Sequence, residues 1–437
     1  MIKRIMPLNL ILFLRFLGLF LVMPVLSVYT MNLEGSTPLL VGIIVGGYAL
    51  TQAIFQMPFG MLSDKIGRKP AILVGLLIFM IGSLVCALST DVYTLMIGRF
   101  LQGAGAIGSV VIAMISDTVE EENRAKAMAV MGGFIGLAFS ASMLLGPLLS
   151  ANGNVAILFY ISAGAALIGA IILYTKAHTP PKIIHVYHNT TTIKDIARDP
   201  NLLRLAVAAF FQKGMMAAAF VTIPIVLTHT FEYEHSSLWK VYLISLVFGV
   251  IAMAPAAIMG EKHNKPREIF IASTALFTIS FVLMTLASST TMFVIATVIF
   301  FIAFNMMEPL LQSMISKVAK VHQKGTAIGM ANTFAYVGTF LGAVLAGSLL
   351  RGGGSQSGLW IFAAIGIVWF AWTLTMKNPI RHAHLYLNLS DVNMDKLNSL
   401  EHDGIAEWYI NDTQKLAVVK YQKHLINEDN LRNSLLN

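Results

Sequence analysis

Four ionisable side chains lie inside long apolar stretches of the sequence, where a charge is costly. They are Arg15, Arg99, Lys213 and Glu308. Ionisable residues in such stretches mark ion pathways, substrate pathways or proton relays, because a charge at this depth needs a partner or a polar cavity. Glu308 is the one carboxylate well inside such a stretch, and a carboxylate there can bind and release a proton. The pattern predicts a proton site at Glu308, with Arg15, Arg99 and Lys213 as further candidates for proton coupling.

These residues also have purely structural interpretations. Glu308 could form a fixed ion pair with a basic residue of another helix, and Arg99 could brace neighbouring helices through their backbone carbonyls. The single cysteine, Cys86, excludes an internal disulfide and a Cys-x-x-Cys metal or redox site. The sequence shows no nucleophile–base pair, no phosphate-binding loop and no cluster of metal ligands. We therefore expect neither an enzyme nor a bound metal or cofactor.

A second polar cluster lies in the short basic segment 60–69. It contains three cations, Lys65, Arg68 and Lys69, with one carboxylate, Asp64, beside them. The two glycines of the segment would allow close approach of helices and a sharp turn. A short cationic loop between two apolar runs is typical of the cytoplasmic face of a membrane protein. The glycines are Gly60 and Gly67.

The composition indicates a membrane protein rather than a soluble one. Of 437 residues, 56% are hydrophobic and 12% are charged, whereas soluble domains carry roughly 25% charged residues. The net charge of +8 would suit a nucleic-acid partner, but the cations cluster in short segments between apolar runs, which is the pattern that orients membrane proteins. We expect the partners to be a lipid bilayer, a small-molecule substrate and protons, with no nucleic acid, and we expect a monomer.

Twelve apolar runs are each long enough to cross a bilayer as a helix. The loops on one side carry cations such as Lys65, Arg124 and Lys317, whereas the other side has little beyond Lys240 and Arg351. This asymmetry places both termini in the cytoplasm. The runs are 7–31, 38–61, 70–89, 92–115, 126–150, 155–176, 201–229, 238–260, 269–288, 292–316, 324–350 and 357–377.

The runs divide the chain into two six-helix halves, 1–176 and 201–378, joined by a polar cytoplasmic linker, 177–200. The composition changes again at 379–437, where the periodicity predicts a strand at 384–389, a helix, two further strands and a final helix. This βαββα order is ferredoxin-like in outline without the last strand. From 385 to 437 the tail has eight carboxylates and five cations, so it could dock on the basic face of the membrane part or bind a regulator.

Several motifs in this sequence resemble those of the major facilitator superfamily, transporters with two six-helix halves. The spacing Gly-x3-Asp-Lys-x-Gly-Arg-Lys at 60–69 resembles motif A, and Gly98 to Gly105 resembles motif B. Gly133, Gly146 and Pro147 resemble motif C, which the family associates with proton-coupled export. Ser142 replaces an intermediate glycine of that motif, so the match is partial, and small residues there could simply pack helices closely. The resemblance implies an all-α membrane fold of twelve helices, with the tail as an added α+β module.

The resemblance also implies a conformational latch in segment 60–69. In the family a carboxylate after the fourth span pairs with the motif A arginine, which here gives Asp117 with Arg68, near Arg124. Asp64 would lie against the N-terminal amides of the eleventh span, near Gly325, because a helix N-terminus carries a partial positive charge. Such a contact forms only when the cytoplasmic face is closed, so the latch would favour an outward-open state.

The function that the resemblance implies is proton-driven export of small molecules or drugs across a bacterial inner membrane, by alternating access. Phe304, Met306 and Met307 could accept varied apolar substrates, or could equally be core residues. Two alternatives stay open. The chain could be a membrane-anchored sensor or regulatory protein that uses its tail as the output, or it could be an uncoupled facilitator.

Overall fold

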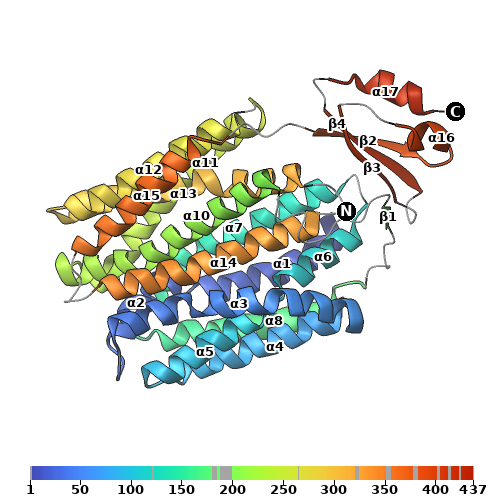
Figure 1. Cartoon of the computed structure of the whole chain (residues 1–437). Coiled ribbons are helices and arrows are strands. Elements are labelled where there is room, and N and C mark those ends of the chain that lie inside the picture. The colour runs from blue at the N-terminus through green and yellow to red at the C-terminus, as the bar shows by residue number, and fades with distance from the viewer. Residues whose placement is uncertain are drawn as a thin grey trace.

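The computed structural model places a bundle of long helices beside a small sheet-and-helix module (Figure 1). Among the described residues, eleven helices are long and apolar enough to cross a membrane, and a shorter apolar helix, Leu359–Thr373, follows them. The predicted all-α membrane fold with a small α+β module is therefore confirmed. The described residues are 2–120, 123–179, 185–187, 199–263, 265–319, 324–350, 356–376, 382–400, 404–411, 415–422 and 425–436.

The helices follow the predicted apolar runs in order, in two sets. The first set is α1 (Ile2–Phe20), α2 (Met23–Met31), α3 (Pro38–Ile66), α4 (Arg68–Ala87), α5 (Val92–Ala104), α6 (Gly108–Thr118), α7 (Arg124–Leu149) and α8 (Ala156–Thr175). The second set is α10 (Pro200–Ile225), α11 (Leu238–Glu261), α12 (Pro266–Leu286), α13 (Thr290–Val318), α14 (Lys324–Leu349) and α15 (Leu359–Thr373). We call these sets the N half and the C half.

The predicted spans 7–31 and 92–115 are present, but each is divided into two helices, which the sequence did not indicate. The first divides between Phe20 and Met23, where Pro24 lies in the first turn of α2 and proline suits a helix start. The second divides at Gly105, which packs so closely on the backbone of Gly75 in α4 that a side chain would collide with the Gly75 carbonyl. Glycine at position 105 lets the two backbones touch, at the expense of helix continuity.

Polar residues just before several helices define where those helices begin. Asp91 accepts hydrogen bonds from the backbone N–H groups of Tyr93 and Thr94 at the start of α5. Asp199, Thr37 and Ser289 cap α10, α3 and α13 in the same way. Such caps satisfy backbone N–H groups that have no partner inside the helix.

The tail folds as the predicted βαββα module. Its elements are β2 (His382–Asn388), α16 (Met394–Asn398), β3 (Ile405–Asn411), β4 (Leu416–Gln422) and α17 (Glu428–Leu435). The strands are antiparallel, with β4 between β3 and β2. Leu385, Leu387 and Val419 from one face of the sheet pack with Leu431 and Leu435 of α17, which forms a small separate core.

A strand from the linker between the halves joins this sheet. β1 (His185–Tyr187) pairs antiparallel with β3, so that Val186 lies opposite Ile410 and the strand order is β1-β3-β4-β2. The sequence predicts only a polar linker at 177–200. Three residues have too little periodicity to reveal a strand that is paired with a segment more than two hundred residues away.

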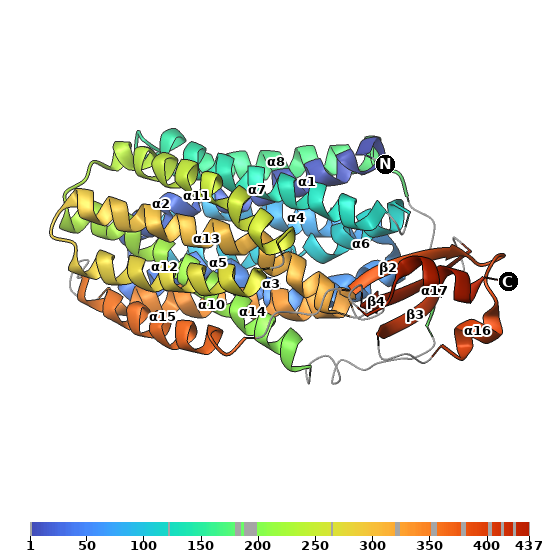
Figure 2. The ribbon, with the colours of Figure 1, turned by 90° about the horizontal axis from the view of Figure 1, so that it is seen from above.

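The module lies at one end of the helix bundle, as both views show (Figures 1 and 2). We call this the module end and the opposite one the far end. The two halves meet at the far end through closely packed helices: in α3, a side chain at Gly42 would lie 2.9 Å from the Cα atom of Val344 in α14. Ser27 of α2 donates a hydrogen bond of 3.3 Å to the Phe220 carbonyl of α10, and Tyr242 of α11 donates one to the Pro24 carbonyl.

Near the middle of the bundle, Gln52 Nε2 of α3 donates a 2.8 Å hydrogen bond to the Tyr336 hydroxyl of α14. Between the described residues of the two halves, no hydrogen bond or ion pair is found closer to the module end than this one. The contacts therefore close the bundle at its far end and in its middle.

Candidate functional site

Lys213 and Glu308 form an ion pair in the interior of the C half. Lys213 Nζ of α10 lies 2.8 Å from Glu308 Oε2 of α13. The two side chains keep 21% and 34% of their surface exposed, so the pair is not sealed inside the helix packing. Lys213 Nζ also lies 4.9 Å from the centre of the Phe304 ring, one helical turn before Glu308. A carboxylate, an ammonium group and an aromatic face thus meet at one point, where a proton or a cation could exchange.

Phe304, which lies beside this pair, belongs to a group of aromatic rings from both halves. The Phe304 ring lies 5.8 Å from the ring of Phe139 in α7, and Phe139 lies 6.2 Å from Phe220 in α10 and 5.5 Å from Phe20 in α1. Of these residues only Phe304 was singled out from the sequence. Phenylalanine is common in apolar helices, so sequence alone does not show which rings meet between the halves. Met307, also considered there, is fully buried.

Arg15 lies in the N half and binds backbone rather than a carboxylate. Its Nη2 donates to the carbonyls of Gln102, at 2.9 Å, and Gly105, at 3.2 Å, and its guanidinium group lies 3.9 Å from the centre of the Phe79 ring. These carbonyls are at the C-terminal end of α5, where a positive charge is favourable. Arg15 therefore supports the end of the interrupted helix.

Arg99 is fully buried in the same region. Its Nε donates to the Ile44 carbonyl of α3 at 3.2 Å, and its Nη1 donates to Gln102 Oε1 at 2.7 Å. Gln102 in turn donates to Ser83 Oγ of α4. No carboxylate of the described residues pairs with Arg15 or Arg99. The four candidates for proton coupling thus separate into two structural braces in the N half and one ion pair in the C half.

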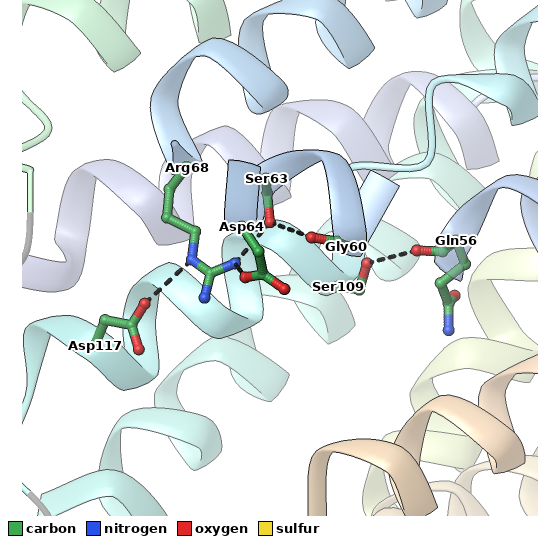
Figure 3. A network of polar contacts seen from close by, with 7 residues as sticks. All are labelled: Gln56, Gly60, Ser63, Asp64, Arg68, Ser109 and Asp117. Carbon is green, nitrogen blue, oxygen red and sulfur yellow. Dashed lines mark hydrogen bonds and ion pairs between the residues drawn. The ribbon is translucent and has the colours of Figure 1, made fainter. Parts of the chain in front are cut away.

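The segment 60–69 forms a compact polar network at the module end (Figure 3). Arg68 is its centre: Nη1 lies 2.7 Å from Asp64 Oδ1 and 2.6 Å from Ser63 Oγ, and Nε lies 3.2 Å from Asp117 Oδ2 at the end of α6. Ser63, which the sequence did not single out, donates to the Gly60 carbonyl as well. The network binds the α3–α4 turn to the second half of the interrupted fourth span.

The turn itself depends on Gly67. Gly67 has φ +96°, a conformation that favours glycine because it has no Cβ atom. Gly60 has open space where a side chain would be, so it makes no close helix contact in this conformation. Lys65 is exposed and Lys69 is half-buried.

Asp64 is held by Arg68 and its side chain keeps 66% of its surface exposed. The structure shows no contact between Asp64 and the described part of α14. Arg124 begins α7, and its side chain lies outside the described residues.

The residues that resemble motif C behave in two ways. Gly146 packs directly on the Leu21 carbonyl, at the break between α1 and α2, and Ser142 Oγ donates to the Leu17 carbonyl at 3.1 Å. Pro147 follows inside α7. Gly133 has open space where a side chain would lie. The far-end part of α7 is therefore packed tightly against α1, whereas Gly133 makes no such contact.

Within the part of the chain that the structure describes, no group of three His, Cys, Asp or Glu side chains could hold a metal ion.

Comparison with known proteins agrees with this architecture. Residues 8–260 and 241–387 match the family model of the Major Facilitator Superfamily. The inner membrane transport protein YajR of Escherichia coli is 35% identical over 425 residues, 95% of this chain and 93% of that protein. The quinolone resistance protein NorA of Staphylococcus aureus is 28% identical, over 79% of this chain and 90% of NorA.

Solved structures share the fold at low sequence identity. The human organic anion transporter MFSD10 has a TM-score of 0.63 at 17% identity, covering 85% of this chain and 99% of that one. The nucleoside transporter NupG has a TM-score of 0.68 at 13% identity, covering 85% of this chain and 98% of that one. The family model and the long match to YajR decide the family. This chain belongs to the major facilitator superfamily of membrane transporters.

Proposed function

We propose that the chain is a proton-coupled antiporter that exports small molecules, including drug-like ones, by alternating access. The observation that supports this most is the Lys213–Glu308 pair, which is partly exposed and lies beside Phe304, a ring that contacts Phe139 of the other half. Its carboxylate is the proton site in this proposal. The resistance function in the name of NorA supports drug-like substrates.

Antiport requires that the proton and the substrate compete for one site. The geometry of the Lys213–Glu308 pair indicates which chemical groups of a substrate could compete with a proton. A proton on Glu308 and a positive group of a substrate both satisfy the same carboxylate, and each would displace Lys213 from it. The face of Phe304, which now lies under the Lys213 ammonium group, would accept such a cation. A negative group would instead bind Lys213 and favour the proton on Glu308, which would give cotransport. The antiport proposal therefore favours substrates with a positive group.

For the orientation, we propose that the module end faces the cytoplasm of a bacterium and that the membrane is the inner one. The α3–α4 turn, which carries Lys65, Arg68 and Lys69, lies at that end (Figure 1), as does the end of α13, which carries Lys317. Excess cations in short loops mark the cytoplasmic side, and the related YajR is an inner membrane protein. In this orientation the described conformation is inward-open, because the contacts between the halves lie at the far end and in the middle.

The latch belongs to the opposite state in this proposal. When the module end closes, Asp64 leaves Arg68 and meets the start of α14, while Arg68 keeps Asp117. The partial positive charge at a helix N-terminus would stabilise the carboxylate there. Asp64 thus has a different partner in each state, which gives the latch its dependence on conformation.

Flux into everted membrane vesicles with a pH-sensitive dye tests the proposal. We expect a cationic drug to dissipate the proton gradient in the wild type and not in Glu308→Gln, which cannot exchange a proton. The matched control is Glu268→Gln, at an exposed position in the first turn of α12, and it should behave as the wild type does. Wild-type coupling in Glu308→Gln would remove Glu308 from the mechanism.

The same vesicles separate the two alternatives. An uncoupled facilitator would carry substrate equally after the gradient has been collapsed. A sensor or regulatory protein would lose its function on removal of 379–437 and keep it in Glu308→Gln. Neither alternative needs the ion pair at Lys213 and Glu308.

A further inference from the structure

The strand β4 is buried on both faces of the module's sheet, although the described helices of the module pack on only one of them. Ala417, Val419 and Tyr421 of β4 belong to the module's own core, on the side of α16 and α17. Side chains alternate along a strand, so Val418 and Lys420 lie on the opposite face. They are nevertheless 0% and 2% exposed. This second face therefore packs against something other than the module's own core.

The contacts of Lys420 show that this second face meets the membrane bundle. Lys420 Nζ donates a 2.7 Å hydrogen bond to the backbone carbonyl of Ala319, the C-cap residue that follows α13 of the membrane bundle. A second partner is Glu407, its neighbour on β3, whose Oε1 lies 3.7 Å away. A buried ammonium group is stable only with such partners, and the C-terminal end of a helix attracts positive charge. The contact is therefore a specific dock of the module on the C half.

The module is also connected to the N half, through β1. Roughly ten residues separate the end of α8 at Thr175 from His185 of β1, and a chain of that length spans at most about 35 Å. Since β1 is paired with β3, the end of α8 is tied to the sheet, and through Lys420 to the end of α13. The sheet thus bridges the two halves at the module end.

We propose that the module acts as a clasp, which is a bridge between the two halves that restrains their movement during transport. It contacts Ala319 at the end of α13 through Lys420, and it holds the linker through β1. The engaged clasp stabilises the conformation that is closed at the far end. Closure of the module end changes the positions of α8 and α13 relative to each other, so this bridge must loosen. Ala319 also lies only a few residues before α14, which begins at Lys324 and is the helix that Asp64 would meet. A contact that is made in one state biases the equilibrium toward that state.

The test measures the opening of the far end in the purified full-length protein. Ser27 is fully buried at the contact of the halves, so Ser27→Cys in a Cys86→Ala background reacts with a maleimide only when the far end opens. We expect Lys420→Met to raise the labelling rate roughly fivefold or more, a change of about 1 kcal/mol. The control is Lys396→Met, whose Nζ bonds only the Leu436 carbonyl within the module. It should leave the rate unchanged.

A second variant acts on the other strand of the clasp. Val186→Pro with Tyr187→Pro must remove at least one N–H donor from the β1–β3 ladder, because successive N–H groups point to opposite sides of a strand. It should raise the labelling rate, as Lys420→Met does. The clasp proposal would be overturned if the labelling rate stayed unchanged in both variants. It would also be overturned if Lys396→Met raised the rate as much as Lys420→Met does. The readout needs neither substrate nor a proton gradient, so failure of the antiport proposal would leave this result interpretable.

Discussion

Gly42→Ala should shift the protein toward the conformation that is open at the far end. A Cβ atom on Gly42 would lie 2.9 Å from the Cα atom of Val344 and 3.0 Å from the carbonyl carbon of Ala343, both of which are backbone atoms of α14. Backbone cannot rotate away as a flexible side chain can, so α3 and α14 must separate. The collision exists only while these helices touch, and it disappears when the far end opens.

The expected size follows from the cost of overpacking, about 1–3 kcal/mol. The gain in helix propensity from glycine to alanine is about 1 kcal/mol and is present in both conformations, so it cancels. The ratio of open to closed protein should therefore rise roughly 5- to 150-fold. The matched control is Gly132→Ala in α7, where a Cβ atom meets nothing within 4 Å.

Maleimide labelling of Ser27→Cys in the Cys86→Ala background measures this ratio. We expect faster labelling in Gly42→Ala and an unchanged rate in Gly132→Ala. Equal rates in the two variants would refute the inference that close packing of α3 on α14 holds the far end shut.

Two further predictions concern residues of the N half. Asp64→Asn should lower the labelling rate at Ser27→Cys. The conformation that is open at the far end loses the contact of Asp64 with α14, whereas the closed one loses only an ion pair in which Asp64 is 66% exposed and Arg68 keeps Asp117; an unchanged rate would contradict the latch. Arg15→Met should cost about 1–3 kcal/mol of stability, since methionine cannot donate to the carbonyls of Gln102 and Gly105. A lower midpoint in a thermal unfolding assay would show this, and an unchanged midpoint would mean that Arg15 does not brace the end of α5.

Most of the fold could be predicted from the sequence, because long apolar helices and alternating strands of seven residues leave local patterns. Each apolar run became a helix or a pair of helices, and the alternation in the tail placed β2, β3 and β4. The break at Gly105 was not foreseen, because it follows from contact with Gly75 on another helix. β1 was not foreseen either, because its partner β3 lies at the other end of the chain.

The candidate site was predictable only in part for the same reason. The cost of intramembrane charge pointed to Glu308, Lys213, Arg15 and Arg99, but their partners depend on packing between helices distant in sequence. In the folded bundle Glu308 forms an ion pair with Lys213, whereas Arg15 and Arg99 donate hydrogen bonds to backbone carbonyls. The pairing of Arg68 with Asp117 was implied by the family's motif, whereas the contact of Phe139 with Phe304 between the halves had no signal in the sequence.

Proton release on substrate binding tests the central claim most directly. The purified protein is placed in weakly buffered solution with a pH indicator, at each of several pH values, and a transported cationic substrate is added. Competition for the carboxylate predicts that the wild type releases protons in proportion to the substrate bound and that Glu308→Gln binds without release. Equal release from both proteins, or proton uptake by the wild type, would contradict antiport through Glu308.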